Sequence, residues 1–350
     1  MKTKKCLILT IICLALLISG CTTKSDKISK ANYSVAIIKT PKVSEINKKT
    51  SIEYYDYDLK KVDEKNYNYG GVGRTNFGLP FKEGKYVYEL SVGYGEDKED
   101  CKVLQIDKNN GNVKEYQVCK YTNNIAVDDK YVYGIHNLNG DTTVSRTEIK
   151  DNKKVETTFK GDISTECYLY NGDLFRLTGW KNGRVFIEKA IFDKKNSMPC
   201  RIELTKYIDQ ETEPESYFNY KDKLYLPAKD GLLCIKDNKI KEVKLKKLNN
   251  TYPRLLRADG KYLYIAVASI FAENDNSIIV KYNMDTDDVE KKYTVDSSIV
   301  QFDVVKNDLY ILNFYDELIK YEIKGNEILK KKKIDLECDE GKYISAMYAK

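Results

Sequence analysis

The sequence lacks the residue patterns of the common hydrolases. It has a single histidine, His136, and no Gly-x-Ser-x-Gly turn of the kind that holds a nucleophilic serine. One histidine excludes metal sites built from several histidines, and as a general base His136 would need a partner to orient it. The simpler interpretation is a histidine at the end of a strand with no catalytic role. We therefore expect no catalytic residue, no bound metal and no cofactor.

The chain has 53 acidic residues, and carboxylates offer two further kinds of chemistry. Acidic clusters at 96–100 and 209–213 lack the alternating Asp, Asn and Gly pattern of a calcium-binding loop, so we interpret them as solvated loops. A pair of carboxyl groups about 5–10 Å apart would instead suit glycoside hydrolysis. The sequence does not identify such a pair. An enzyme that acts on extracellular glycans, with a carboxylate pair in a central pocket, is therefore the alternative to a non-catalytic protein.

Two of the nine cysteines, Cys101 and Cys119, flank a turn at 108–112. A three-residue loop at 109–111 would place them opposite each other across a hairpin, close enough for a disulfide. A two-residue loop would shift the register by one residue and leave two ordinary buried thiols. The sequence leaves both outcomes open. No Cys-x-x-Cys pair occurs, which disfavours zinc binding and redox chemistry.

The first 21 residues have the features of a targeting signal. Three lysines within the first five residues precede an uncharged, mostly apolar run of 15 residues, shorter than the roughly 20 of a spanning helix. This pattern is typical of a secretory signal peptide, and its end, Ile18-Ser19-Gly20-Cys21, resembles the lipobox of bacterial lipoproteins. The resemblance implies that residues 1–20 are removed and that diacylglycerol on Cys21 anchors the protein to the membrane. A plain secretory peptide with an incidental cysteine is the alternative.

The predicted anchor places the protein at the cell membrane, facing outside the cytoplasm. The polar stretch that follows predicts a division into a lipidated cysteine with a flexible tether at 21–49 and a folded domain at 50–350. The chain has 59 basic and 53 acidic residues, so removal of three signal-peptide lysines leaves 56 against 53, or +3. A charge this small gives no electrostatic basis for binding nucleic acid.

A short unit recurs along the folded part of the chain. It consists of a polar or glycine turn followed by an apolar and aromatic segment, as in Asp259-Gly260-Lys261-Tyr262-Leu263-Tyr264. Seven copies begin at Glu83, Asp128, Asn171, Lys221, Asp259, Lys306 and Glu340. Their mean spacing of about 43 residues lies in the range of four-stranded propeller blades. The segment after each turn is apolar at successive positions, which predicts a strand buried on both faces.

The two ends of the repeat predict how a ring would close. The last copy, at 340–350, has room for two strands, whereas 51–62 look like a hairpin that lacks two strands before it. Joining these ends would complete a seventh blade and remove the free sheet edges.

Residues 259–265, followed by 279–283, resemble the repeats of bacterial seven-bladed propellers of the YVTN or quinoprotein-like kind. The resemblance is generic and covers about residues 50–350. It implies an all-β fold: a seven-bladed β-propeller of four-stranded blades, closed by N- and C-terminal strands in one blade. A ring of six or eight blades, or a pair of irregular β-sandwiches, are the alternatives.

In propellers the loops between the second and third strands share one face with the links between blades. In this sequence those loops are often longer than the other turns and carry unusual side chains. Exposed aromatic residues suit both protein contacts and stacking on sugars. The candidate binding residues of this face are Tyr94, His136, Trp180, Phe271 and Tyr315. We expect a monomeric, lipid-anchored, non-catalytic protein that binds an envelope protein or a cell-wall glycan there.

Overall fold

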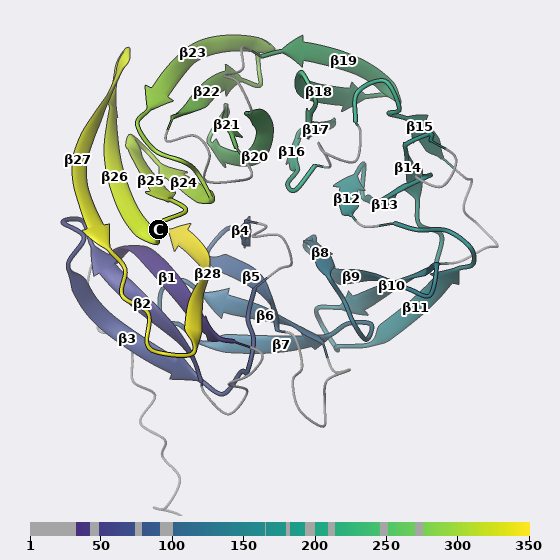
Figure 1. Ribbon diagram of the computed structural model, residues 1–350. Helices are drawn as coiled ribbons and strands as arrows, with labels where there is room; N and C mark the ends of the chain where they lie inside the picture. The colour runs from purple at the N-terminus through teal and green to yellow at the C-terminus, as the bar shows by residue number, and fades with distance from the viewer. Residues whose placement is uncertain are drawn as a thin grey trace, which may run out of the picture.

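The computed structural model describes residues 33–42, 49–73, 79–91, 101–164, 166–179, 183–192, 200–208, 214–245, 251–269 and 276–350. These residues form seven antiparallel sheets of four strands each, arranged as blades around a central axis (Figure 1). The predicted all-β, seven-bladed propeller is thereby confirmed. Over these ranges the chain contains no helix, and hence none of the length and apolarity needed to cross a membrane.

We number the blades along the chain and name the strands of each blade A to D from the axis outwards (Figure 1). Blade 1 consists of β4 (Phe81–Glu83), β5 (Tyr86–Ser91), β6 (Lys102–Asp107) and β7 (Val113–Gln117). Blade 2 consists of β8 (Asn124–Val127), β9 (Tyr131–Leu138), β10 (Asp141–Glu148) and β11 (Lys154–Phe159). Blade 3 consists of β12 (Cys167–Tyr170), β13 (Asp173–Thr178), β14 (Phe186–Lys189) and β15 (Arg201–Glu203).

The remaining blades follow the same order of strands until the ring closes. Blade 4 consists of β16 (Phe218–Tyr220), β17 (Lys223–Ala228), β18 (Gly231–Lys236) and β19 (Lys239–Lys244). Blade 5 consists of β20 (Tyr252–Asp259), β21 (Tyr262–Ala268), β22 (Ser277–Asn283) and β23 (Asp288–Val295). Blade 6 consists of β24 (Gln301–Val305), β25 (Asp308–Leu312), β26 (Glu317–Lys324) and β27 (Glu327–Asp335). Blade 7 consists of β28 (Lys342–Ala349), β1 (Tyr33–Pro41), β2 (Thr50–Asp56) and β3 (Lys61–Tyr67).

The apolar core lies between neighbouring blades. Tyr264 and Ile279 of blade 5 pack with Phe302 and Ile311 of blade 6, and similar clusters join other blades. Strand B therefore has a packed sheet on each side, and six of the seven residues of β21 are buried. The outer strand β23 instead alternates between exposed and partly buried residues over most of its length. Because packing occurs between the blades, the axis is left for polar side chains.

The ring closes as the sequence predicts, with both ends of the chain in one blade. β28, from the C-terminus, pairs with β1, so that Tyr348 lies opposite Ala36 and Met347 opposite Ile37. The division of strands differs from the expectation, however. The C-terminus supplies one strand and the N-terminus three, whereas two from each end were predicted.

The predicted start of the folded domain at residue 50 is wrong for the same reason. Residues 33–41, assigned to the flexible tether, form β1, the second strand of blade 7. Every residue of β1 except Ser34 is buried. Its apolar run is visible in the sequence. In the other blades the second strand follows the first along the chain, but here the first strand, β28, lies at the far end of the chain, so the repeat unit did not predict β1. The stretch that remains for the predicted tether is residues 22–32.

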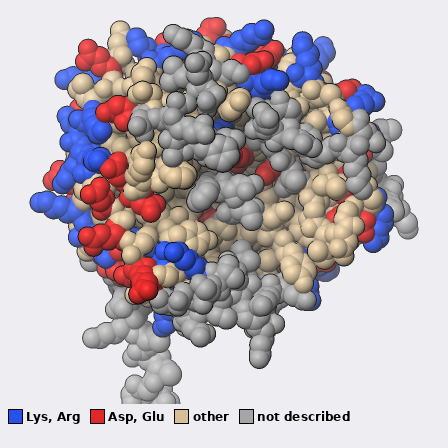
Figure 2. All heavy atoms as spheres, viewed as in Figure 1, with Lys and Arg blue, Asp and Glu red and all other residues tan. Residues whose placement is uncertain are grey.

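The four consecutive lysines at 330–333 lie on β27, the outer strand of blade 6. Lys330 is 3.2 Å from Asp296, Lys331 is 2.9 Å from Glu322, and Lys333 pairs with Glu317. Figure 2 shows basic and acidic side chains interleaved along the edge of the molecule that β27 forms in Figure 1. Charged residues on an outer strand discourage pairing with another sheet, and the ion pairs offset the positive charge of this run.

Candidate functional site

The propeller has two faces with different connections. The loop face, as we call it, holds the loops between strands B and C and the links from strand D to the next strand A. The turn face holds the A–B and C–D turns. On the turn face most connections are short; in the A–B turn of blade 5, Gly260 has a φ of 60°, a conformation that glycine adopts without strain.

Three of the five predicted binding residues, Tyr94, Trp180 and Phe271, lie outside the described residues. The structure therefore does not place them. His136 lies near the end of β9 with only 8% of its surface exposed, and its ring is 6.2 Å from that of Tyr121. Burial lowers the pKa of the His136 imidazole, although Glu156 acts in the opposite direction. This neutral, buried histidine is suited to packing the end of the blade.

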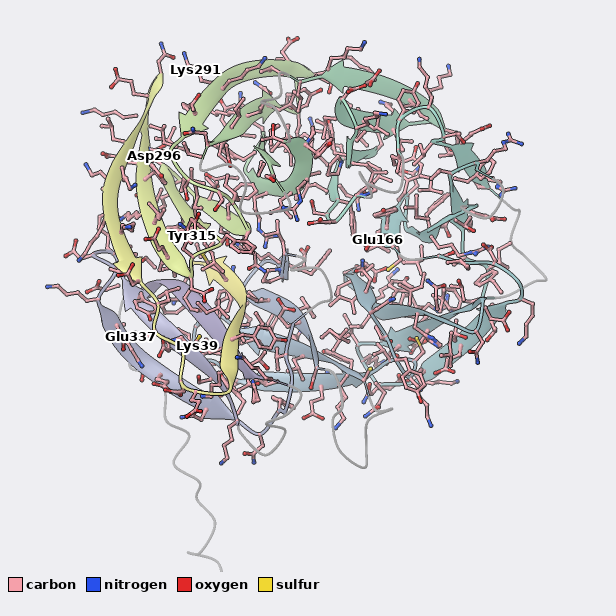
Figure 3. All side chains as sticks on the ribbon, in the orientation of Figure 1. Lys39, Glu166, Lys291, Asp296, Tyr315 and Glu337 are labelled. Atoms are coloured by element: carbon pink, nitrogen blue, oxygen red, sulfur yellow. The ribbon has the colours of Figure 1, made fainter. Side chains whose placement is uncertain are left out.

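Tyr315 is the predicted residue that the structure places at the surface of the loop face. It lies between β25 and β26, is 59% exposed, and stands beside Phe314, which is 52% exposed. The side-chain oxygen of Asn313 accepts hydrogen bonds from the backbone amides of Tyr315 (3.0 Å) and Glu317 (2.9 Å), which shapes this loop. Figure 3 shows Tyr315 on the side of the ring that β24 to β27 form.

Exposed apolar side chains are more numerous on the loop face than on the turn face. Nine large apolar residues are exposed in the described part of the chain, and five of them lie at the loop-face ends of strands or in loop-face connections. These five are Tyr121, Leu138, Phe314, Tyr315 and Tyr343. Three of the other four, Val62, Val155 and Leu329, lie on outer strands, and Tyr57 lies in a turn of the opposite face. Tyr121 and Tyr343 were not predicted because they lie in or beside the links from strand D to strand A, and Leu138, beside a B–C turn, was not predicted because it is not aromatic.

The disulfide considered between Cys101 and Cys119 is not formed. Both thiols are buried. Lys102 pairs with Gln117, so Val118 rather than Cys119 stands opposite Cys101, the one-residue shift that separates the two cysteines. The Cys119 sulfur instead lies 3.2 Å from the hydroxyl of Thr122, and burial raises the pKa of this thiol.

A cavity of about 430 Å³ opens on the turn face, around the axis of the ring. The inner strands β4, β8, β12, β16 and β20 line it together with the turns that follow β8, β12 and β16. Basic lining residues are Lys82, Lys221, Lys223 and Arg257, and acidic ones are Glu83, Asp128, Asp129 and Asp222. We call this cavity the axial pocket. Sequence analysis did not locate it, although charged residues within the apolar inner strands, such as Arg257 between Leu256 and Ala258, are a signal for it.

Asp303 of β24 is the buried charge beside the axial pocket, with 1% of its surface exposed. One of its carboxylate oxygens accepts from Lys82 at 2.7 Å and from the backbone amide of Ala349 at 2.7 Å. The other oxygen is 3.6 Å from the Nε of Arg257. Burial by itself would raise the pKa of this carboxyl, but the positive charges of Lys82 and Arg257 outweigh burial and hold the pKa below its usual value.

Other charged residues that line the axial pocket form ion pairs at its rim. Asp222 pairs with Lys236 at 2.7 Å, Lys221 with Asp285 at 2.7 Å, and Lys223 with Asp287 at 2.7 Å. Within the described ranges, no group of three or more His, Cys, Asp or Glu residues is arranged to hold a metal ion.

Comparison with known proteins supports the fold and does not identify a family. No family profile and no curated protein matches this chain. A crystal structure of a Bacteroides fragilis protein provisionally named a 6-phosphogluconolactonase has a TM-score of 0.61 and 13% identity, covering 93% of this chain and 99% of that chain. The Kluyveromyces lactis protein Hsv2p has a TM-score of 0.53 and 11% identity, and the match covers 87% of this chain and 96% of that chain. A chain of a mitotic checkpoint complex has a TM-score of 0.51 and 12% identity, and the match covers 75% of this chain and 79% of that chain. At these identities the likeness extends to the propeller fold alone.

Proposed function

We propose that the protein is a lipid-anchored, extracytoplasmic β-propeller that binds an envelope protein or a cell-wall polymer through its loop face, without catalysis. The observation that carries the proposal is the concentration of exposed apolar side chains on that face, among them the adjacent Phe314 and Tyr315. Exposed aromatic residues are common anchors of protein interfaces. The similar propeller in a mitotic checkpoint complex is itself part of a protein assembly.

The position of the N-terminal strand fits an anchor on the opposite face. β1 begins at Tyr33 on the turn face, where the Tyr33 hydroxyl donates to the carbonyl of Lys108 in a C–D turn at 2.6 Å. The backbone amide of Lys350, at the other end of the chain, donates to the carbonyl of Ser34. Only residues 22–32 separate Tyr33 from Cys21. A flexible stretch of that length spans about 18 Å on average, so a lipid on Cys21 would direct the loop face away from the membrane.

The anchor is tested by Cys21→Ser, which removes the thiol that would carry the lipid. We expect the wild-type protein to incorporate a labelled fatty acid and to sediment with membranes, and the variant to do neither. A plain secretory signal would give no lipid labelling in either protein. Persistent labelling of the variant would contradict lipidation at Cys21.

The binding face is tested by in-cell photo-crosslinking from Tyr315, with Tyr57 as the matched control. Both are exposed tyrosines, at 59% and 56%, but Tyr57 lies in a C–D turn of the other face. We replace each with a photoreactive phenylalanine and identify adducts by mass spectrometry. A dominant protein adduct from position 315 that is absent from position 57 is the expected result. Equal adducts from both positions, or adducts from 57 alone, would contradict the loop face as the binding surface.

The second candidate function, an enzyme that acts on extracellular glycans, is favoured by the four carboxylates that line the axial pocket. Asp128 and Asp222 have structural partners: Asp128 accepts from the amide of Tyr131 at 2.6 Å, and Asp222 pairs with Lys236. Glu83 and Asp129 are the remaining acidic residues of the lining. Release of soluble sugar from purified cell wall by the wild-type protein, abolished by Glu83→Gln or Asp129→Asn, would replace the proposal with this alternative.

A further inference from the structure

We propose that the axial pocket is a second binding site, on the turn face, for a small organic anion: a phosphate or carboxylate attached to an apolar or planar body. The proposal goes beyond the loop-face function and depends on neither the lipid anchor nor the partner of that face. It rests on where the charges lie within the pocket and on the aromatic side chains that accompany them.

The inner part of the axial pocket has an excess of positive charge. Lys82 and Arg257, from β4 and β20, both line the pocket, and both approach the same carboxylate, that of Asp303. The side chains of these two cations are only 21% and 11% exposed. One carboxylate neutralises one of the two charges, so the trio carries a net charge of +1 in a place with limited access to water. A bound anion there would gain strength from the low local polarity.

Two further lysines add to this field from the adjoining blades. Lys108, in the C–D turn of blade 1, is partly buried, and burial together with the positive charges of Lys82, Lys350 and Arg257 lowers its pKa. Lys350, which follows β28, contributes a further ammonium group close enough to act on Lys108. Lys108 and Lys350 thus add positive charge next to the group formed by Lys82, Arg257 and Asp303.

The acidic residues of the lining lie at its outer edge. Glu83 and Asp129 flank A–B turns and are exposed, so water screens their charges. Asp128 caps its own turn, and Asp222 pairs with Lys236, as described above. Glu83, Asp129 and Asp222 thus face solvent at the mouth, whereas Lys82 and Arg257 are much less exposed. This arrangement favours a ligand that carries its negative charge at one end and inserts that end first.

Aromatic side chains form part of the remaining wall. Phe81, Tyr170, Tyr217 and Phe218 line the axial pocket, and the ring of Tyr217 lies 6.0 Å from that of Phe81. Behind this wall Tyr168 packs edge-on against Tyr217 at 5.6 Å and supports it. A volume of about 430 Å³ lies within the range of small-molecule sites. The pocket therefore offers cations for the charged end of a ligand and an apolar surface for its body.

The test measures binding of four probes to the purified full-length protein by isothermal titration calorimetry: phenyl phosphate, benzoate, phenol and benzylamine. We expect saturable binding of the two anions, with phenol at least about tenfold weaker because it lacks the charge-assisted hydrogen bonds. Arg257→Gln removes one pocket cation and keeps the Lys82–Asp303 pair, so the Kd of phenyl phosphate should rise at least about tenfold. Lys261→Gln, an exposed lysine in the next turn of the same blade, should leave the Kd unchanged.

A second variant tests the location without altering any charge. Asn219 is an exposed residue of β16 that lines the axial pocket, and Asn219→Trp should fill the pocket and abolish anion binding. Asn326→Trp, in an exposed C–D turn outside the pocket, is its matched control. The proposal is overturned if neither anion binds, if benzylamine binds as tightly as the anions, or if Asn219→Trp binds phenyl phosphate like the wild type. Circular dichroism on each variant shows that a loss of binding is not a loss of fold.

Discussion

Deletion of residues 342–350 should abolish the folded state. The deletion removes β28, the innermost strand of blade 7, and leaves β1 paired with β2 alone. Met347 and Tyr348 are fully buried, and truncating even one large buried side chain typically costs about 2–5 kcal/mol. The loss of a whole strand, with the ring left open, therefore exceeds the roughly 5–15 kcal/mol of net stability typical of a domain. Circular dichroism and urea unfolding of the purified chain measure the effect.

Deletion of residues 22–32 is the matched control, because it removes a longer stretch that ends just before β1. We expect its urea midpoint to stay at the wild-type value. Polar contacts at the closure of the ring add to the expected difference between the two deletions. Lys39 of β1 donates to the carbonyl of Glu337 in the link before β28 and pairs with Glu53 at 2.6 Å. Figure 3 labels Lys39 and Glu337 at this junction. A cooperative unfolding transition in the 342–350 deletion would show that six complete blades suffice and would contradict this account.

Replacing Asp303 with Asn should destabilise the protein by about 3–5 kcal/mol at pH 7, because removal of one partner leaves buried cations without their compensating charge. Asp303 joins three parts of the chain: Lys82 of β4, Arg257 of β20 and the amide of Ala349 at the end of β28. Asp335→Asn, at an exposed position at the end of β27, is the control and should change stability by less than about 0.5 kcal/mol. Urea unfolding at equilibrium gives both values.

The same variant predicts a change in pH dependence. The pKa of Asp303 is lowered in the folded state, so its contribution to the free energy of unfolding is complete above the pKa of an unfolded aspartate, about 3.9. That contribution is lost as the pH falls from there through the lower folded value. Wild-type stability should therefore decline below about pH 4 more steeply than that of Asp303→Asn. Parallel curves for the two proteins would mean that Asp303 is not the ionised partner of Lys82 and Arg257.

Both predictions concern the same region of the molecule. The C-terminal strand closes the ring, and its last residues also supply the Ala349 amide and the Lys350 ammonium beside the axial pocket. A variant that opens blade 7 should therefore also lose the proposed anion site. Tyr315, on the other face of blade 6, belongs to a loop held by Asn313 and Glu317 rather than by these charges. The two faces can thus be altered separately.

Local sequence determines most of the blade structure. Each repeat carries its own turn and its own doubly buried strand, and neighbouring strands in a blade are connected by short segments of chain, so the pattern of residues predicts hairpins without knowledge of the rest. The number of blades and closure through the two ends follow from the spacing of these units. Phe314 and Tyr315 are exposed because they occupy a loop between two such strands, which the sequence also shows.

What the sequence could not determine depends on contacts between distant segments. β1 was assigned to the tether because its partner β28 lies some 300 residues away, and the Cys101–Cys119 register was open because one residue of turn length decides it. The axial pocket likewise depends on contacts between segments that are far apart in the sequence. Lys82 and Asp303 are 221 residues apart, and nothing in the short strand β4 or in the mostly apolar strand β24 indicates that the two meet. Closing the ring brings inner strands from separate blades to one axis, and only this long-range geometry turns isolated charges into a site.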